Sequence, residues 1–92
     1  MATLSAKEIV NKHFLTGTTN EKLIKYGKIN KNMAYELTQN HGAYLDWSKY
    51  HLRVILYNPD TDKTESMDNL NKYECSLEEI NNHIEKMKNK IL

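Results

Sequence analysis

Length, composition and charge indicate one small folded domain, which we expect to span residues 1–92. The chain has 92 residues, of which 39% are hydrophobic and 27% charged, with a net charge of +1; these values are ordinary for a globular protein. No apolar run has the length of about 20 residues that a membrane span needs, and no signal-peptide pattern is present, so we expect neither a membrane protein nor a secreted precursor. Cys75 is the only cysteine, which rules out an internal disulfide and favours the cytoplasm.

The first expected element is a helix over residues 6–15. Ser5 and Glu8 have the spacing of a capping box, in which each residue satisfies a backbone N–H of the other. The apolar residues that follow recur on one helical face. The first helix is therefore the best-marked element of the N-terminal half.

Two more helices are expected before residue 41. Thr18 and Glu21 repeat the capping pattern ahead of a short apolar face, and Gly27 is a typical helix stop, so a helix is predicted near 19–26. The stretch "KNMAYELTQNHG" has apolar residues at helical spacing and predicts a third helix near 31–40. The N-terminal half should thus be helical.

A hairpin is expected in the middle of the chain. "AYLDW" at 43–47 fits a strand or a helix, whereas "YHLRVILY" at 50–57 alternates and is rich in β-branched and aromatic residues, as strands are. "NPDTD" predicts a turn. "KTESM" then returns as an edge strand, because it has almost no apolar face, and residues 68–75 look like a connection.

The chain closes with a long amphipathic helix. Ser76 and Glu79 form a third capping pattern, and a coiled-coil-like seam follows: Leu77, Ile80, Ile84, Met87 and Ile91. The seam has two readings, a lid on its own domain or a homodimer interface through residues 77–91. The predicted fold class is α+β: a helical N-terminal half, a β-hairpin or small antiparallel sheet, and this C-terminal helix.

The sequence offers no catalytic, metal or cofactor motif. Its histidines are scattered, and no metal-binding spacing accompanies them. The stretch 60–71 resembles a calcium loop, but Glu65 replaces the required glycine and Asn71 the bidentate glutamate. No basic cluster or glycine-rich elbow activates Cys75. We therefore expect a protein that is not an enzyme and that binds no cofactor.

An aromatic group with one arginine is the first candidate binding surface. Such residues dominate binding hot spots because they bury a large area and keep a polar handle, although they can equally fill a core that contains a single Phe. The candidate partner-binding residues are Tyr44, Trp47, Tyr50, Arg53 and Tyr57.

A helix-turn-helix over residues 19–40 is the second candidate surface, with the hairpin as a wing. In this interpretation Asn, Gln and Lys side chains read bases or phosphates; otherwise the region is a generic three-helix packing unit. The candidate nucleic-acid-binding residues are Lys28, Asn30, Lys31, Asn32, Tyr35 and Gln39.

Charge distribution and residue usage complete the functional expectation. Residues 1–57 carry eight basic and four acidic side chains, whereas 58–92 carry five and eight, so an acidic partner would favour the first half. Twelve lysines against one arginine, with eleven asparagines, indicate an AT-rich gene. The leading hypothesis is a small binding protein that modulates a larger partner by protein–protein contact, such as a phage or mobile-element inhibitor of a host enzyme or defence system. The alternative is a winged-helix-like DNA-binding transcriptional regulator; no membrane partner is expected.

Overall fold

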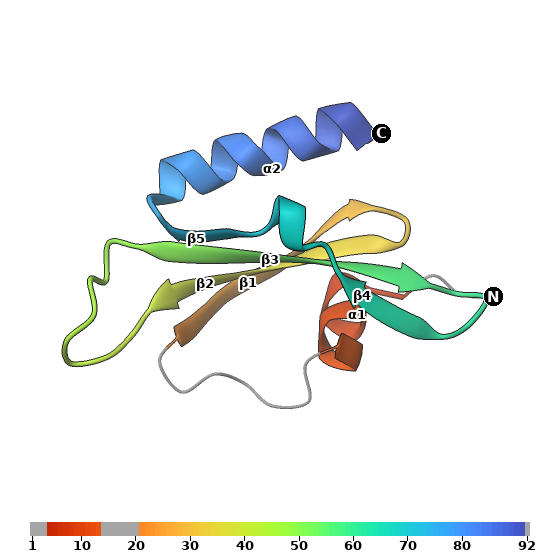
Figure 1. Cartoon of the computed structure of the whole chain (residues 1–92), viewed down its shortest axis with the longest axis horizontal. Helices are drawn as coiled ribbons and strands as arrows, with labels where there is room; N and C mark the ends of the chain where they lie inside the picture. The colour runs from red at the N-terminus through yellow and green to blue at the C-terminus, as the bar shows by residue number, and fades with distance from the viewer. Residues whose placement is uncertain (1–3, 14–20, 92) are drawn as a thin grey trace.

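The protein folds into three layers, with one helix on each face of an antiparallel sheet (Figure 1). The computed structural model describes residues 4–13 and 21–91. Its elements in chain order are α1 (Ala6–His13), β1 (Glu21–Asn30), β2 (Met33–Asn40), β3 (Tyr50–Asn58), β4 (Lys63–Ser66), the 3-10 turn η1 (Asp68–Leu70), β5 (Lys72–Cys75) and α2 (Leu77–Ile91).

The sheet has the order β1-β2-β3-β4, and β5 also pairs with β3. All pairings are antiparallel. Strands β4 and β5 share the outer edge of β3, since β4 pairs with its second half and β5 with its first. Between them η1 leaves the sheet, and Asn71 Oδ1 accepts a hydrogen bond from the Val54 N–H at 2.7 Å in place of a strand partner.

Helix α2 covers one face of the sheet and buries the larger part of the core. Ile80, Ile84 and Met87 are all buried and pack on side chains from the three long strands. The strand residues of this core are Ile29, Met33, Tyr35, Leu37, Leu52 and Val54. The three central residues of the predicted seam are therefore used inside the domain, as the lid interpretation expects. A homodimer through the same seam would require α2 to leave the sheet.

The short helix α1 covers one end of the opposite face. Ile9 and Val10 pack on Ala34 and Ile55, with Tyr26 and Tyr57 at the margin of this second core. The two cores together explain why β2 and β3 are buried along most of their length. Strands covered on both faces lose the alternation of polar and apolar exposure that marks one-sided sheets.

Several sequence predictions are confirmed. The capping box of α1 is formed, since the Ser5 N–H donates to Glu8 Oε1 at 3.0 Å and the Glu8 N–H donates to Ser5 Oγ at 3.2 Å. Ser76 Oγ likewise accepts from the Glu79 N–H at 3.2 Å and caps α2. The strand at 50–57, the turn after it and the edge strand that follows are present as β3 and β4. The α+β class also holds.

The prediction of a helical N-terminal half is wrong. The structure has strands β1 and β2 where helices near 19–26 and 31–40 were expected, and residues 14–20, including Thr18, lie outside the described part. Met33, Tyr35 and Leu37 share one face with a period of two, while Ala34 of the other face completed an apparent helical pattern. Pairing on both sides of β2 outweighs the weak local preference of its residues for a helix. Residues 68–75, expected as a connection, contain η1 and β5.

Gly27 lies within β1 and does not end a helix. It pairs with Tyr35 across the β1–β2 ladder. A Cβ at this position would lie 2.2 Å from Cζ of Tyr35, because the tyrosine ring crosses directly over the glycine. Glycine here makes room for an aromatic ring of the core.

Neither helix combines the length and apolar character needed to cross a membrane, as judged over residues 4–13 and 21–91.

Candidate interaction surface

The loop between β2 and β3, residues 41–49, is built from two consecutive turns. The first is closed by a hydrogen bond from the Leu45 N–H to the Gly42 carbonyl (3.3 Å), and the second by one from the Lys49 N–H to the Asp46 carbonyl (3.1 Å). Asp46 Oδ1 also accepts from the backbone N–H and the hydroxyl of Ser48, and these bonds lower the pKa of the Asp46 carboxyl group. The backbone of the loop is thus held by its own hydrogen bonds.

The side chain of Trp47 contacts residues at the start of this loop and stabilises its conformation. Its indole N–H donates to the Gly42 carbonyl at 2.9 Å, and its ring centroid lies 4.7 Å from that of His41. Gln39 Nε2 donates to the Trp47 carbonyl at 2.6 Å, which ties the loop to the end of β2. Tyr44, by contrast, is fully exposed at the tip. The loop therefore presents a tyrosine on a framework that is already ordered.

The exposed large hydrophobic residues lie on this loop or on the elements that begin or end at the same end of the sheet. Strands β1 and β3 and helix α2 begin at this end of the sheet, and β2 and β5 end there, as Figure 1 shows on the left. Within the described ranges, every large hydrophobic side chain that is exposed lies on these elements or on the loop. We call this set the end surface: Leu23, Ile24, Tyr44, Leu45, Trp47, Tyr73 and Leu77.

The structure separates the five aromatic-group residues that the sequence singled out. Tyr44 and Trp47 belong to the end surface. Tyr50 lies beside it but packs, half-buried, on the α2 core. Arg53 lies on the face of the sheet opposite to that of Tyr50. Tyr57 lies near the far end of β3, where its hydroxyl donates to Asp62 at 2.7 Å. This hydrogen bond raises the pKa of the Tyr57 phenol.

The sequence did not identify the other five members of the end surface. Leu23 and Ile24 were assigned to the buried face of a helix that does not exist. Leu45 was part of the ambiguous stretch, and Tyr73 of the expected connection. Leu77 is the first residue of the α2 seam, and a seam position gives no sign that its side chain stays exposed. The one signal in the sequence that could have indicated this surface is the Leu-Ile pair between two lysines, a pattern that is typical of an exposed edge strand.

A polar cluster lies on the α1-facing side of the sheet, beyond the end of α1. Asn40 Nδ2 donates to Glu74 at 2.9 Å, so its Oδ1 accepts from Nε2 of the buried His51. Glu36 and Arg53 form an ion pair at 3.5 Å, and the Arg53 guanidinium lies 5.6 Å from the centroid of the Tyr73 ring. These contacts join β2, β3 and β5. They account for most of the charged groups of the cluster, which we interpret as a structural tie between the strands.

The residues proposed for reading nucleic acid do not share a helical face. Tyr35 is buried in the α2 core, and Gln39 supports the β2–β3 loop at the opposite end of the hairpin. The Lys28 ammonium group donates to the carbonyls of Leu4 (2.6 Å) and Lys31 (2.8 Å). The remaining residues, Asn30, Lys31 and Asn32, surround the β1–β2 turn. The predicted recognition helix is wrong.

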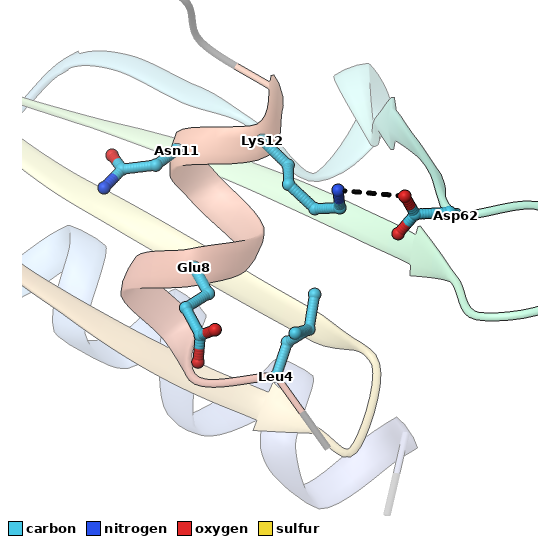
Figure 2. Close-up of a pocket in the computed structure, with 5 residues that line it drawn as sticks. All are labelled: Leu4, Glu8, Asn11, Lys12 and Asp62. Carbon is cyan, nitrogen blue, oxygen red and sulfur yellow. Dashed lines mark hydrogen bonds and ion pairs between the residues drawn. The ribbon is translucent and has the colours of Figure 1, made fainter. Parts of the chain in front are cut away.

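A shallow hollow beside α1 is drawn in Figure 2. It is lined by Leu4, Glu8, Asn11, Lys12 and Asp62. Lys12 reaches across it to Asp62, with Nζ and Oδ2 3.1 Å apart, and Glu8 is engaged with Ser5. Its three ionisable side chains therefore already have partners within the protein, and the hollow offers no convergent polar groups to a ligand.

Cys75 is half-buried at the junction of β5 and α2. Burial raises the pKa of its thiol, and the nearby Glu79 carboxyl group raises it further. Its Sγ donates to the Tyr73 carbonyl at 3.3 Å. A thiol with a raised pKa is a poor nucleophile near neutral pH, because the reactive species is the thiolate.

Comparisons with protein-family models, with curated proteins and with solved structures found no match to this chain.

Proposed function

We propose that this chain is a small non-enzymatic binding protein that modulates a larger partner by protein–protein contact through the end surface. The observation that supports this most directly is that the exposed large hydrophobic residues of the described ranges all lie on the β2–β3 loop or on elements that begin or end at that end of the sheet. Contiguous exposed apolar patches on small proteins commonly mark interaction sites. Tyr and Trp are also the residues that most often carry binding energy at interfaces.

The order of the β2–β3 loop strengthens this proposal. Association is penalised by the entropy lost when a flexible loop is immobilised. Here the Trp47–Gly42 bond, the Asp46–Ser48 bonds and the two turns hold the loop in place before any partner arrives. The exposed tyrosine at its tip can then bind with little further ordering cost.

The lysine- and asparagine-rich composition supports an origin in an AT-rich genome. A phage or mobile-element accessory protein that inhibits a host enzyme or defence system fits that composition, the small size of the chain and the exposed hydrophobic residues of the end surface. The residues expected to carry the contact are Tyr44, Leu45 and Trp47, with Leu23 and Ile24 beside them.

The proposal is tested with immobilised full-length chain and lysate from the natural host, with and without nuclease. The informative variant is Tyr44→Ala/Leu45→Ser, since both side chains are exposed and neither makes a side-chain hydrogen bond that the fold needs. Asp60→Ser/Thr61→Ala, at the opposite end of β3, is the control for two exposed loop substitutions. Circular dichroism melts should show both variants folded.

We expect the wild type and the control to retain one specific host protein after nuclease treatment. The Tyr44→Ala/Leu45→Ser variant should bind that protein at least about 30-fold more weakly, which corresponds to a hot-spot loss of about 2 kcal/mol. Equal capture by all three proteins would refute the end surface as the contact. Capture that nuclease abolishes would favour a nucleic-acid partner instead.

A further inference from the structure

Strand β1 is the one long open edge of the sheet within residues 4–13 and 21–91. It spans Glu21–Asn30 and pairs only with β2 there, so its outer N–H and C=O groups have no strand partner in that range. The opposite edge differs, because two four-residue strands and η1 share the outer side of β3. An unpaired strand edge is a template onto which another extended chain can add.

The β1 edge carries a regular series of lysines. They recur at every third position, with Lys22, Lys25 and Lys28 in β1 and Lys31 in the turn that follows. Lys28 is held by two backbone carbonyls, whereas Lys22 and Lys25 are exposed and make no hydrogen bond or ion pair with the described residues. Between these two cations lie Leu23 and Ile24, whose side chains are 44% and 42% exposed. The first half of β1 thus offers backbone pairing groups, apolar contact and positive charge together.

A second copy of this chain is a poor occupant for that edge. Antiparallel pairing of β1 with itself brings two lysine-rich strands side by side, and like charges across a strand pair are destabilising. The β1–β2 register also shifts between Leu23 and Lys25 and between Lys28 and Asn30. Such irregularities and edge lysines are the means by which proteins prevent self-pairing of edges.

An acidic segment of a different protein carries a charge opposite to that of the lysines along this edge. We infer that β1 accepts an extended, acidic segment of a partner protein, which adds to the sheet as a further strand beside Lys22–Lys28. Its backbone pairs with β1, its carboxylates approach Lys22 and Lys25, and its apolar side chains contact Leu23 and Ile24. The inference rests on the proposed function, because Leu23 and Ile24 belong to the end surface.

The experiment uses a fluorescein-labelled ten-residue peptide of alternating Glu and Val, titrated with the full-length chain at low ionic strength. One control peptide alternates Lys and Val, and another carries Pro in place of the adjacent fifth and sixth residues, so that it lacks a backbone N–H on each side of the strand. We expect the acidic peptide to bind at least about 10-fold more tightly than either control, since the first lacks the charge and the second cannot pair its backbone. Added salt should weaken the binding.

Variants of the chain locate the bound peptide. Lys22→Glu/Lys25→Glu should weaken acidic-peptide binding at least about 10-fold, because attraction becomes repulsion at both positions. Lys63→Glu/Lys72→Glu makes the same change in charge on β4 and β5 at the other edge, and should leave binding within about 2-fold. Hydrogen exchange followed by NMR should show new protection at β1 amides when the peptide is bound, with β4 and β5 unchanged.

Three results would overturn strand addition: no binding of the acidic peptide at millimolar concentration, equal binding of the proline peptide, or new protection confined to the β4–β5 edge. A dimer of the free chain in sedimentation, with its β1 amides protected from hydrogen exchange, would make the second copy the occupant and would also overturn it. The proposed function fails separately. If the peptide does not bind while host-protein capture still depends on Tyr44 and Leu45, strand addition is refuted and the binding function stands.

Discussion

Gly27 and Tyr35 provide the sharpest test of the packing between β1 and α2. The two residues are paired across the β1–β2 ladder, and Tyr35 is only 4% exposed. A Cβ on Gly27 would lie 2.2 Å from Cζ, 2.3 Å from the hydroxyl oxygen and 2.4 Å from Cε1 of the tyrosine. These separations are far below van der Waals contact, so Gly27→Ala forces the ring of Tyr35 out of its place in the core.

The expected size of the effect follows from two opposing contributions. Overpacking a well-filled core costs about 1–3 kcal/mol. Replacing glycine by alanine in a strand recovers about 0.5–1 kcal/mol, because alanine loses less conformational freedom on folding. Because a separation of 2.2 Å is a severe overlap, the upper half of the overpacking range applies, and Gly27→Ala should lower the free energy of unfolding by about 1–2.5 kcal/mol. For a domain of this size, that is a fall in Tm of about 4–20 °C.

A double-mutant cycle isolates the steric contribution. Wild type, Gly27→Ala, Tyr35→Leu and the double variant are unfolded in urea and followed by far-ultraviolet circular dichroism. In the Tyr35→Leu background the ring is absent, so Gly27→Ala should be neutral or stabilising by up to about 1 kcal/mol. If Gly27→Ala is as stable as the wild type, or costs the same in both backgrounds, the ring-over-glycine contact does not constrain the strand.

Three further predictions concern α2, the sheet edge and the first helix cap. Ile84→Ala should cost about 2–4 kcal/mol of stability because a buried side chain of the α2 core is truncated; in sedimentation, Ile84→Asp should give an unfolded monomer, and a folded monomer in place of a wild-type dimer would make α2 an interface. Asn71→Leu should cost about 1–3 kcal/mol in urea unfolding because the buried Val54 N–H loses its acceptor, whereas Asn71→Asp keeps an acceptor oxygen and should cost less; equal losses would contradict this role. The Ser5 backbone N–H, and then the Ser5 hydroxyl, lower the pKa of Glu8; this stabilisation is present above the unfolded-state pKa and is lost as pH falls through the folded-state pKa. Glu8→Gln retains the cap geometry without titrating, so its stability should fall less steeply than the wild type's between about pH 5 and pH 3, and identical pH profiles would refute the assignment.

The candidate site was only partly accessible to sequence reasoning. Tyr44 and Trp47 were identified because Tyr and Trp dominate binding hot spots. The structure places Tyr50 and Arg53 on opposite faces of the sheet and Tyr57 near the far end of β3, since neighbours on one strand alternate between faces and β3 is nine residues long. Tyr73 joins the end surface only through pairing of β5 with β3, a contact between residues about twenty positions apart. Local spacing contains no information about such pairings.

Sequence by itself determined the elements whose signals are local. Capping pairs close within one helical turn, so Ser5–Glu8 and Ser76–Glu79 marked the beginnings of α1 and α2 correctly. The alternation in residues 50–57 likewise marked β3, and the proline-containing turn marked its end. The capping and turn signals depend on side chains that interact with backbone only a few residues away.

Only the tertiary structure decided the conformation of residues 21–40 and the composition of the end surface. β2 pairs with a strand on each side, and a helix covers each of its two faces. Its ladder hydrogen bonds and the side chains that bury both of its faces are therefore contributed by distant segments. Those interactions outweigh intrinsic helix preferences that amount to less than about 1 kcal/mol per residue. The same sheet brings the start of β1, the β2–β3 loop, β5 and the start of α2 to one end, because antiparallel strands return the chain there repeatedly (Figure 1).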